Sequence, residues 1–125
     1  MWPCFAMKFR STDMKYTTSL KKNYDFRIVY RKGKSLANRH LVVYKYRNNL
    51  DINRVGISVS KKVGNSVVRS RVTRLIRESY RLNEEHIDKA GWDFVVIART
   101  TAKGTTYEEI SHSLVSLLKQ HKAYV

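Results

Sequence analysis

The sequence predicts one α+β domain, a sandwich with a small sheet and the element order α-β-β-α-β-α. Three stretches lead to this prediction: helical periodicity over residues 65–82, strict alternation over residues 54–60, and a nearly continuous apolar run over residues 93–99. The chain has 125 residues, of which 42% are hydrophobic, so one domain with a modest core is expected.

The two ends of the chain are predicted to lie outside this domain. Residues 1–19 begin with a short apolar stretch that lacks the basic and apolar regions of a signal peptide. We expect residues 1–19 to form a flexible extension, residues 20–120 to form the single domain, and residues 121–125 to be a fraying tail.

The first predicted helix runs from Leu20 to Gly33. Asn23 is its expected cap, and two cations occupy its last turn, where the helix dipole favours positive charge. Phe26 and Tyr30 share one face of this helix, which is the pattern of side chains that pack on a core.

Two strands follow, at residues 41–46 and 54–60, and the loop between them is rich in Asn and Asp. Because this connection is short, we expect the strands to pair as an antiparallel hairpin. The second strand places its aliphatic residues on one face and Gly56, Ser58 and Ser60 on the other. The Gly and Ser face is too small to fill a core, so it is either exposed to solvent or a shallow floor.

A basic helix is predicted from Asn65 onward, after a break at Gly64, with Asn65 or Ser66 as its cap. Residues 61–81 contain seven Lys and Arg residues and a single acid, Glu78. At about 100° per residue, apolar side chains gather on one side and arginines on the other. The apolar side consists of Val68, Val72, Leu75, Ile76 and Leu82, and the basic side of Arg69, Arg74, Arg77 and Arg81.

The last third of the chain supplies the remaining core elements. Residues 93–99 are predicted to be a central strand that is buried on both faces. Residues 106–109 match a capping box, which begins the last helix. The apolar stripe of that helix, which we expect to be ordinary core, consists of Tyr107, Ile110, Leu114, Leu117 and Leu118.

The charge of the chain is both large and unevenly distributed. The formal net charge is +15, with a net of +16 in residues 1–82 and −1 in residues 83–125. Such an excess implies an anionic partner, and nucleic acid is the first candidate. A membrane partner is not expected, because no apolar run approaches the ~20 residues that span a bilayer.

The basic helix carries the chemistry that phosphate recognition needs. A guanidinium group is a planar fork of donors that binds phosphate oxygens in two-pronged contacts. Small residues between the arginines, such as Ser70 and Thr73, let a phosphate backbone approach closely. A charged face is often merely solvated, but such faces usually mix both signs, and this one has one acid.

Metal and thiol chemistry are not expected. Cys4 is the only cysteine, so the chain cannot form an internal disulfide, which fits a reducing cytoplasm as the expected location. The four histidines are scattered without the spacing of metal ligands.

Residues 58–71, continuing through residues 74–78, resemble the signature of the bacterial ribonuclease P protein subunit. The shared pattern is Lys61-Lys62, then Gly-Asn, then Arg-x-Arg and further basic residues. The chain departs from that pattern at Ser70, where Asn is usual, and at Thr73, where a basic residue is common. The resemblance extends from about Leu20 to about Lys119.

The resemblance implies a ribosomal-protein-like fold with a left-handed β-α-β crossover, although parallel crossovers are generally right-handed. It implies that the RNA subunit of ribonuclease P is the catalyst and uses Mg²⁺, which the protein itself does not bind. The implied contacts with this catalytic RNA are Lys61, Lys62, Asn65, Arg69, Ser70, Arg71, Arg74 and Arg77.

The resemblance also implies a cleft for the single-stranded 5′ leader of precursor tRNA. Phe26, Tyr30 and Tyr44 are the implied leader-binding residues, because single-stranded RNA stacks on aromatic rings. The holoenzyme removes the leader by hydrolysing one phosphodiester. Neither a small-molecule substrate nor a catalytic residue is expected in the protein.

Three other classes remain open from the residues alone. A structural RNA-binding protein of the ribosomal type, without a processing role, fits the charge equally well. A DNA-binding protein also fits the charge, but the spacing of a helix-turn-helix is missing. A free-standing nuclease would need an acid–base pair or a carboxylate cluster, and the ten acids are scattered.

Overall fold

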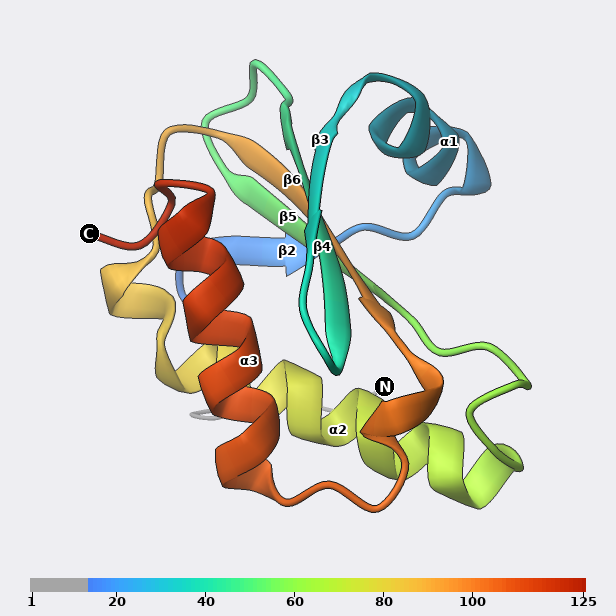
Figure 1. Cartoon of the computed structure of the whole chain (residues 1–125). Coiled ribbons are helices and arrows are strands. Elements are labelled where there is room, and N and C mark those ends of the chain that lie inside the picture. Colours follow the sequence, from blue (N-terminus) through green and yellow to red (C-terminus); the bar gives the residue numbers. More distant parts are fainter. Residues whose placement is uncertain (1–13) are drawn as a thin grey trace.

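The computed structural model describes residues 14–125, so most of the predicted N-terminal extension, residues 1–13, lies outside the described residues. Over these described residues, a five-stranded mixed sheet and three α-helices make up the fold (Figure 1). In chain order, the elements are β2 (Thr17–Ser19), α1 (Asn23–Lys32), β3 (Lys34–Ala37), β4 (Leu41–Arg47), β5 (Asn53–Ser58), α2 (Ser66–Leu82), η1 (Glu84–His86), β6 (Trp92–Ala98), η2 (Thr100–Ala102) and α3 (Tyr107–Gln120). The α+β class and the predicted order of the main elements are confirmed.

The strand order across the sheet is β2-β5-β6-β4-β3. The central strand β6 pairs parallel with β5 and antiparallel with β4, so the predicted hairpin between residues 41–46 and 54–60 is wrong. The apolar strand β6 enters between them because Phe94, Val95 and Val96 are buried on both faces, as the sequence predicts. The chain passes from β5 through α2 to the parallel neighbour β6, and the left hand of that crossover stays a prediction.

The true hairpin joins β3 and β4, which pair antiparallel. The side-chain oxygen of Asn38 accepts hydrogen bonds from the backbone N–H groups of His40 (3.2 Å) and Leu41 (3.1 Å) in the turn. Its amide nitrogen donates to the carbonyl oxygen of Ser113 (2.9 Å), which ties the hairpin to α3. The sequence did not predict β3, because this strand has only four residues and two of them are polar.

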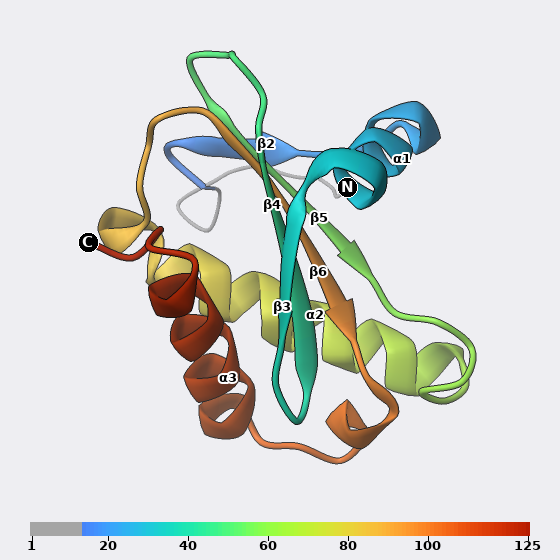
Figure 2. The same ribbon diagram turned by 45° about the horizontal axis from the view of Figure 1, so that its top comes forward.

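The sheet has two unequal apolar layers. The larger layer lies between the sheet and the pair α2 and α3, where Val43 and Phe94 meet Ile76 and Leu114. The smaller layer lies under α1 and consists of Leu20, Val29 and Val95, with Phe26, Tyr44, Tyr46 and Ile97 packed against them. Figure 2 shows α1 set apart from α2 and α3. The helix pair therefore covers one face of the sheet, and the single short helix α1 lies on the other.

Both ends of the described chain are packed more closely than the sequence suggests. Within the predicted extension, β2 pairs with β5, and the Glu84 carboxylate accepts the backbone N–H groups of Lys15 and Tyr16, each at 2.8 Å. At the other end, Ala123 is fully buried and Tyr124 pairs with Ile87. The expected fraying of residues 121–125 is therefore wrong, because apolar side chains in this segment add to the core.

Candidate nucleic-acid interface

The start of α2 is fixed by an N-cap residue and by the close packing of Gly64 against the first helical turn. Asn65 is the N-cap, and its side-chain oxygen accepts the backbone N–H of Val68 (3.0 Å), as one of the two predicted caps. A Cβ atom added to Gly64 would lie 2.7 Å from a methyl carbon of Val68. Gly64 therefore lets the preceding loop turn tightly onto the helix, and it brings Lys61 and Lys62 beside the first helical turn.

One side of α2 is buried against α3 and the sheet. Val72, Ile76 and Tyr80 are fully buried, and the prediction of an apolar stripe through Val72 and Ile76 is confirmed. Leu82 was assigned to that stripe, but it is 56% exposed. The buried side of the helix continues instead with Tyr80, which follows Ile76 by four residues and so lies on the same face. Burial raises the pKa of the Tyr80 hydroxyl, which shares a hydrogen bond with Thr17 (3.1 Å).

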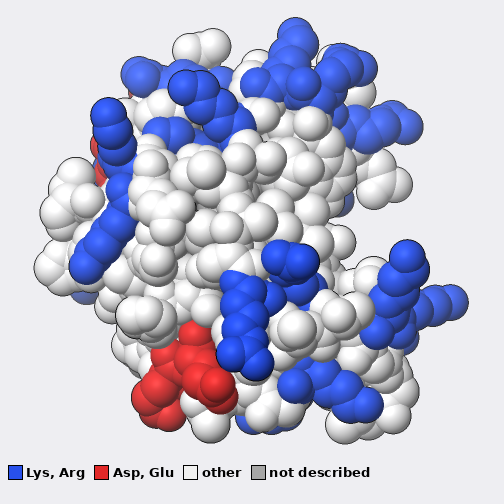
Figure 3. All heavy atoms as spheres, in the orientation of Figure 1, with Lys and Arg blue, Asp and Glu red and all other residues white. Residues whose placement is uncertain are grey.

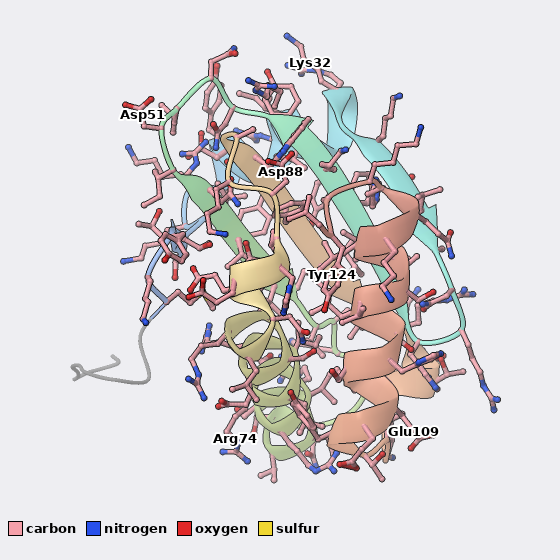
Figure 4. All side chains as sticks on the ribbon, turned by 90° about the vertical axis from the view of Figure 1, so that its left-hand side faces the viewer. Lys32, Asp51, Arg74, Asp88, Glu109 and Tyr124 are labelled. Atoms are coloured by element: carbon pink, nitrogen blue, oxygen red, sulfur yellow. The ribbon has the colours of Figure 1, made fainter. Side chains whose placement is uncertain are left out.

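The other side of α2, together with the loop before it, forms a basic surface, which we call the α2 surface. It contains all eight residues that the sequence analysis assigned to catalytic RNA: Lys61, Lys62, Asn65, Arg69, Ser70, Arg71, Arg74 and Arg77. All but Arg69 are exposed. The prediction that Arg69 lies opposite the apolar stripe is wrong, because its side chain is three residues before the buried Val72, is partly buried and has its Nε atom shielded from solvent. Figure 4 shows Arg74 pointing away from the body of the protein.

The cations of the α2 surface differ in what they already contact. Arg71 donates to the backbone oxygen of Thr105 (2.8 Å), so its guanidinium group is tied to the segment before α3. Arg81 forms an ion pair with Glu78, which neutralises the end of the basic stripe. Within residues 14–125, Lys61, Lys62 and Arg74 form no ion pair or side-chain hydrogen bond, so their charges are available to an anion.

A groove lies on the opposite face of the sheet, between α1 and the end of β5, and we call it the α1–β5 groove. Its volume is about 420 Å³, and it is lined by Asn23, Phe26, Arg27, Tyr30, Ile57 and Ser58. Figure 3 shows a hollow between α1 and the segment that leads into α2, with Lys and Arg side chains on both sides. The groove is thus open, partly aromatic and bordered by positive charge.

The three residues predicted to bind a leader form one aromatic chain. The rings of Phe26 and Tyr30 lie 6.2 Å apart, and those of Tyr30 and Tyr44 lie 5.2 Å apart in an edge-to-face arrangement. Phe26 and Tyr30 line the groove, whereas Tyr44 lies behind Tyr30 and is half-buried. Burial raises the pKa of the Tyr30 hydroxyl, and a hydrogen bond with Ser58 partly offsets this shift.

The predicted floor of Gly and Ser residues is only partly open. A Cβ atom added to Gly56 would lie 2.5 Å from Phe26, so the ring of Phe26 rests directly on the backbone of β5. Gly56 therefore accommodates α1 rather than a ligand. Ser58 remains at the groove, where it contacts Tyr30.

Two features of the groove were missed. Asn23 and Arg27 line it with Tyr30, at the helical spacing i, i+4 and i+7, which periodicity alone could have found. The N-cap of α1 is Lys22, so the prediction of Asn23 as the cap is wrong and its side chain is left to face the groove.

An ion-pair network holds α1 on the sheet, and no local pattern in the sequence predicts it. The Arg54 guanidinium group donates two hydrogen bonds to the Asp93 carboxylate (2.8 and 2.7 Å) and lies 3.4 Å from the Asp25 carboxylate of α1. Asn48 also donates to Asp93 (2.8 Å). These bonds join α1, β5 and β6 at one end of the groove.

Residues 14–125 contain no group of three or more His, Cys, Asp or Glu side chains placed to hold a metal ion. Over the same residues, none of the helices is both long and apolar enough for a bilayer crossing.

Comparison with known proteins agrees with this architecture of a small basic α+β protein. The family model for ribonuclease P matches residues 14–122. The chain is 56% identical over 109 residues to the ribonuclease P protein component of Alkaliphilus metalliredigens, covering 87% of this chain and 97% of that protein. It is 59% identical over 104 residues to the same component of Lachnoclostridium phytofermentans, covering 83% and 89%.

Solved structures give the same result. The Staphylococcus aureus RNase P protein superposes with a TM-score of 0.78 at 45% identity, covering 86% of this chain and 97% of that one. The RNase P protein from Thermotoga maritima superposes with a TM-score of 0.75 at 34% identity, covering 82% and 96%. The fold and the site thus define a protein component of an endoribonuclease that processes tRNA. This chain belongs to the ribonuclease P protein family.

Proposed function

We propose that this protein binds the catalytic RNA of ribonuclease P through the α2 surface and holds the 5′ leader of precursor tRNA in the α1–β5 groove. The observation that carries this proposal is the placement of the two surfaces on opposite faces of one sheet. Two RNA molecules can therefore be held at the same time, one by phosphate contacts and one by a groove with aromatic walls.

The α2 surface suits the backbone of a folded RNA. Its free cations, Lys61, Lys62 and Arg74, project from a helix and its capped start, so their backbone positions are set before RNA binds and only the side chains have to be ordered. The side-chain oxygen of Asn65 is engaged in the cap, which leaves its amide nitrogen as a donor. Ser70 is exposed between the arginines and leaves room for a phosphate group.

The α1–β5 groove suits a single strand. Tyr30 is 39% exposed and offers a ring on which a base can stack, and Arg27 supplies a cation for the backbone. Stacking accepts any base, so the groove favours single-stranded leaders without strong sequence preference. Phe26 and Tyr44 support the ring of Tyr30 from two sides.

Cleavage itself is assigned to the RNA subunit. Hydrolysis of a phosphodiester by a protein needs an activated nucleophile or clustered acids. Among the described acids of this chain, Glu84 and Glu109 accept backbone N–H groups and Asp93 pairs with Arg54. Mg²⁺ would supply charge neutralisation when bound by the RNA. The protein's own residues bind and orient the two RNAs, in the bacterial cytoplasm.

The test is an assay of precursor tRNA cleavage at low Mg²⁺ with a cognate catalytic RNA. We expect the protein alone to be inactive and to stimulate cleavage when the RNA is present, because its charge offsets the repulsion between two RNA molecules. Metal-dependent cleavage by RNA-free protein would contradict the assignment of chemistry to the RNA. Tight RNA binding without stimulation would favour a structural, ribosomal-type role instead.

A further inference from the structure

We propose that a second basic surface, formed by Lys34, Lys45, Arg47 and Lys122, binds the phosphate backbone of a double-helical segment of the catalytic RNA. The proposal rests on the proposed function above, since it adds a second contact between the same two molecules. This second basic surface lies at the opposite end of the protein from α2, where Figure 3 shows Lys and Arg side chains gathered.

Four cations from three elements meet at this surface. Lys34 begins β3 and lies directly opposite Lys45 of β4, and Lys122 follows the end of α3. Burial lowers the pKa of Lys45, and the charges of Lys34 and Lys122 lower it further, against the opposing effect of Asp88. Four positive charges are therefore close together around one acid.

The surface belongs to the same side of the sheet as α2. Leu41 and Val43 of β4 are buried beneath α2 and α3, and alternation along the strand places Lys45 and Arg47 on that side. Tyr44 and Tyr46 point to the other side, toward α1. An RNA that lies on α2 can wrap onto this surface without crossing the sheet, whereas a leader in the groove cannot.

The chemistry of the surface favours a duplex over a single strand. Trp92 lies among these cations, and its ring is covered by Lys45, 4.3 Å from the centroid, and Arg47, at 5.3 Å. A covered ring cannot serve as a stacking platform for bases. Fixed cations without a free aromatic face suit an RNA helix, which is recognised through its phosphates and 2′-hydroxyl groups.

A purely structural role accounts for only part of this cluster. Lys45 donates a hydrogen bond to the backbone oxygen of His121, at the end of α3, so this one cation stabilises the fold. The side chains of Lys34 and Lys122 form no hydrogen bond or ion pair with the residues that the structure describes. Like charges directly opposite each other, as Lys34 and Lys45 are, destabilise a sheet. Lys122 also has a φ of 60°, a conformation in which glycine is favoured.

The test compares three proteins for binding to the catalytic RNA over a range of salt concentrations. The first is the unchanged protein, the second carries Lys34→Gln, Arg47→Gln and Lys122→Gln, and the third carries Lys34→Arg, Arg47→Lys and Lys122→Arg. Lys45 is kept, because its hydrogen bond to His121 is structural. The third protein keeps every charge at the same positions and is therefore the matched control.

We expect the glutamine variant to bind about tenfold more weakly near physiological salt, with the slope of log K against log salt reduced by about 2 to 3. The charge-preserving variant should bind like the unchanged protein. Equal binding by all three proteins would overturn the proposal. A loss confined to precursor tRNA binding by the assembled holoenzyme would also overturn it, because the substrate would then be the partner.

A tethered probe keeps the test decisive if the glutamine variant folds poorly. An iron chelate attached to Lys122→Cys, in a Cys4→Ser background, should cut the catalytic RNA within a base-paired segment. Cuts only in the precursor tRNA, or none, would overturn the proposal while leaving the α2 surface unaffected. Failure of the unchanged protein to bind the catalytic RNA would overturn the proposed function and this proposal together.

Discussion

The α2 surface and the α1–β5 groove are built in different ways. The α2 surface comes from one continuous segment, residues 61–77, and most of its side chains project into solvent. The groove is assembled from α1, β5 and the tyrosine of β4 behind them, and its wall residue Phe26, like Tyr44 behind Tyr30, also packs in the smaller apolar layer. A substitution on the α2 surface should therefore change RNA binding without changing stability, whereas a substitution in the groove should change both.

The largest effect is expected from Asp93→Ala. The Asp93 side chain is 2% exposed and holds Arg54, which is also close to Asp25 of α1. Removing one partner of a buried pair leaves an uncompensated charge, so the free energy of unfolding should fall by about 3 kcal/mol. Denaturant unfolding measures this. The control is Asp51→Ala on an exposed loop, which should change stability by less than about 0.5 kcal/mol; equal losses would contradict the role of the network.

A paired comparison of Gly56→Ala and Gly64→Ala separates the two surfaces. Each added methyl group meets a side chain at less than 3 Å, Phe26 in the first case and Val68 in the second. Overpacking of this kind costs about 1–3 kcal/mol. Gly56→Ala should weaken precursor tRNA binding by the holoenzyme, and Gly64→Ala should weaken catalytic RNA binding. Losses of the same size in both assays for both variants would show that the surfaces are not independent.

Tyr30→Ala tests the stacking wall of the groove. We expect precursor tRNA binding to weaken by about 1–3 kcal/mol, the effect of losing one stacked base. Mature tRNA, which has no leader, should bind the variant holoenzyme as it binds the unchanged one. The more buried Tyr44 serves as the comparison, because Tyr44→Ala should lower the melting temperature more and discriminate less between the two tRNAs. Equal losses of affinity for both tRNAs with Tyr30→Ala would contradict the proposal that the α1–β5 groove binds the leader.

Arg74→Ala should leave stability unchanged, because this side chain is exposed and unpaired among residues 14–125. Loss of one phosphate contact should reduce the slope of log K against log salt for catalytic RNA by about 0.7–0.9. Binding isotherms at several salt concentrations measure this slope. Arg81→Ala is the matched control, because Arg81 is already paired with Glu78; a slope change as large as that of Arg74→Ala would place the boundary of the α2 surface further along the helix.

The smallest effect concerns alkaline pH. Burial raises the pKa of both Tyr80, below the α2 surface, and Tyr30, in the groove. Above the unfolded-state pKa of about 10, the unfolded chain loses these protons while the folded chain keeps them, so stability falls as the pH rises. Unfolding at pH 9 and pH 11 should show that Tyr80→Phe reduces this loss more than Tyr30→Phe. The reverse order would mean that the groove, not the core beneath α2, excludes water more completely.

Local signals predicted the α2 surface well because one helix contains it. The Asn65 cap, the burial of Val72 and Ile76, and the exposure of Arg74 all follow from periodicity along a single segment. The exposure of Leu82 was missed because Tyr80 offers a larger apolar surface to the core near the helix end, and the partial burial of Arg69 was missed near the helix start. Short-range pattern is sufficient where neighbours in sequence are also neighbours in space.

The groove could be predicted only in part, because it depends on strand order. Phe26, Tyr30 and Tyr44 were brought together as expected, but through contacts between α1 and β4 that no local pattern specifies. The short loop after β4 suggested a hairpin, whereas burial of the apolar strand β6 on both faces outweighed that local preference. The role of Gly56 under Phe26 follows from this arrangement and has no separate signal in the sequence.

The edges of the sheet have a consequence for self-association. The outer strands, β2 and β3, are only three and four residues long, and β3 begins with Lys34. Short, charged edge strands offer few unpaired backbone groups to another chain, so edge-to-edge stacking into aggregates is disfavoured. Like-charge repulsion and the absence of a long open edge among its described strands therefore both disfavour edge-to-edge assembly of this strongly basic protein with copies of itself.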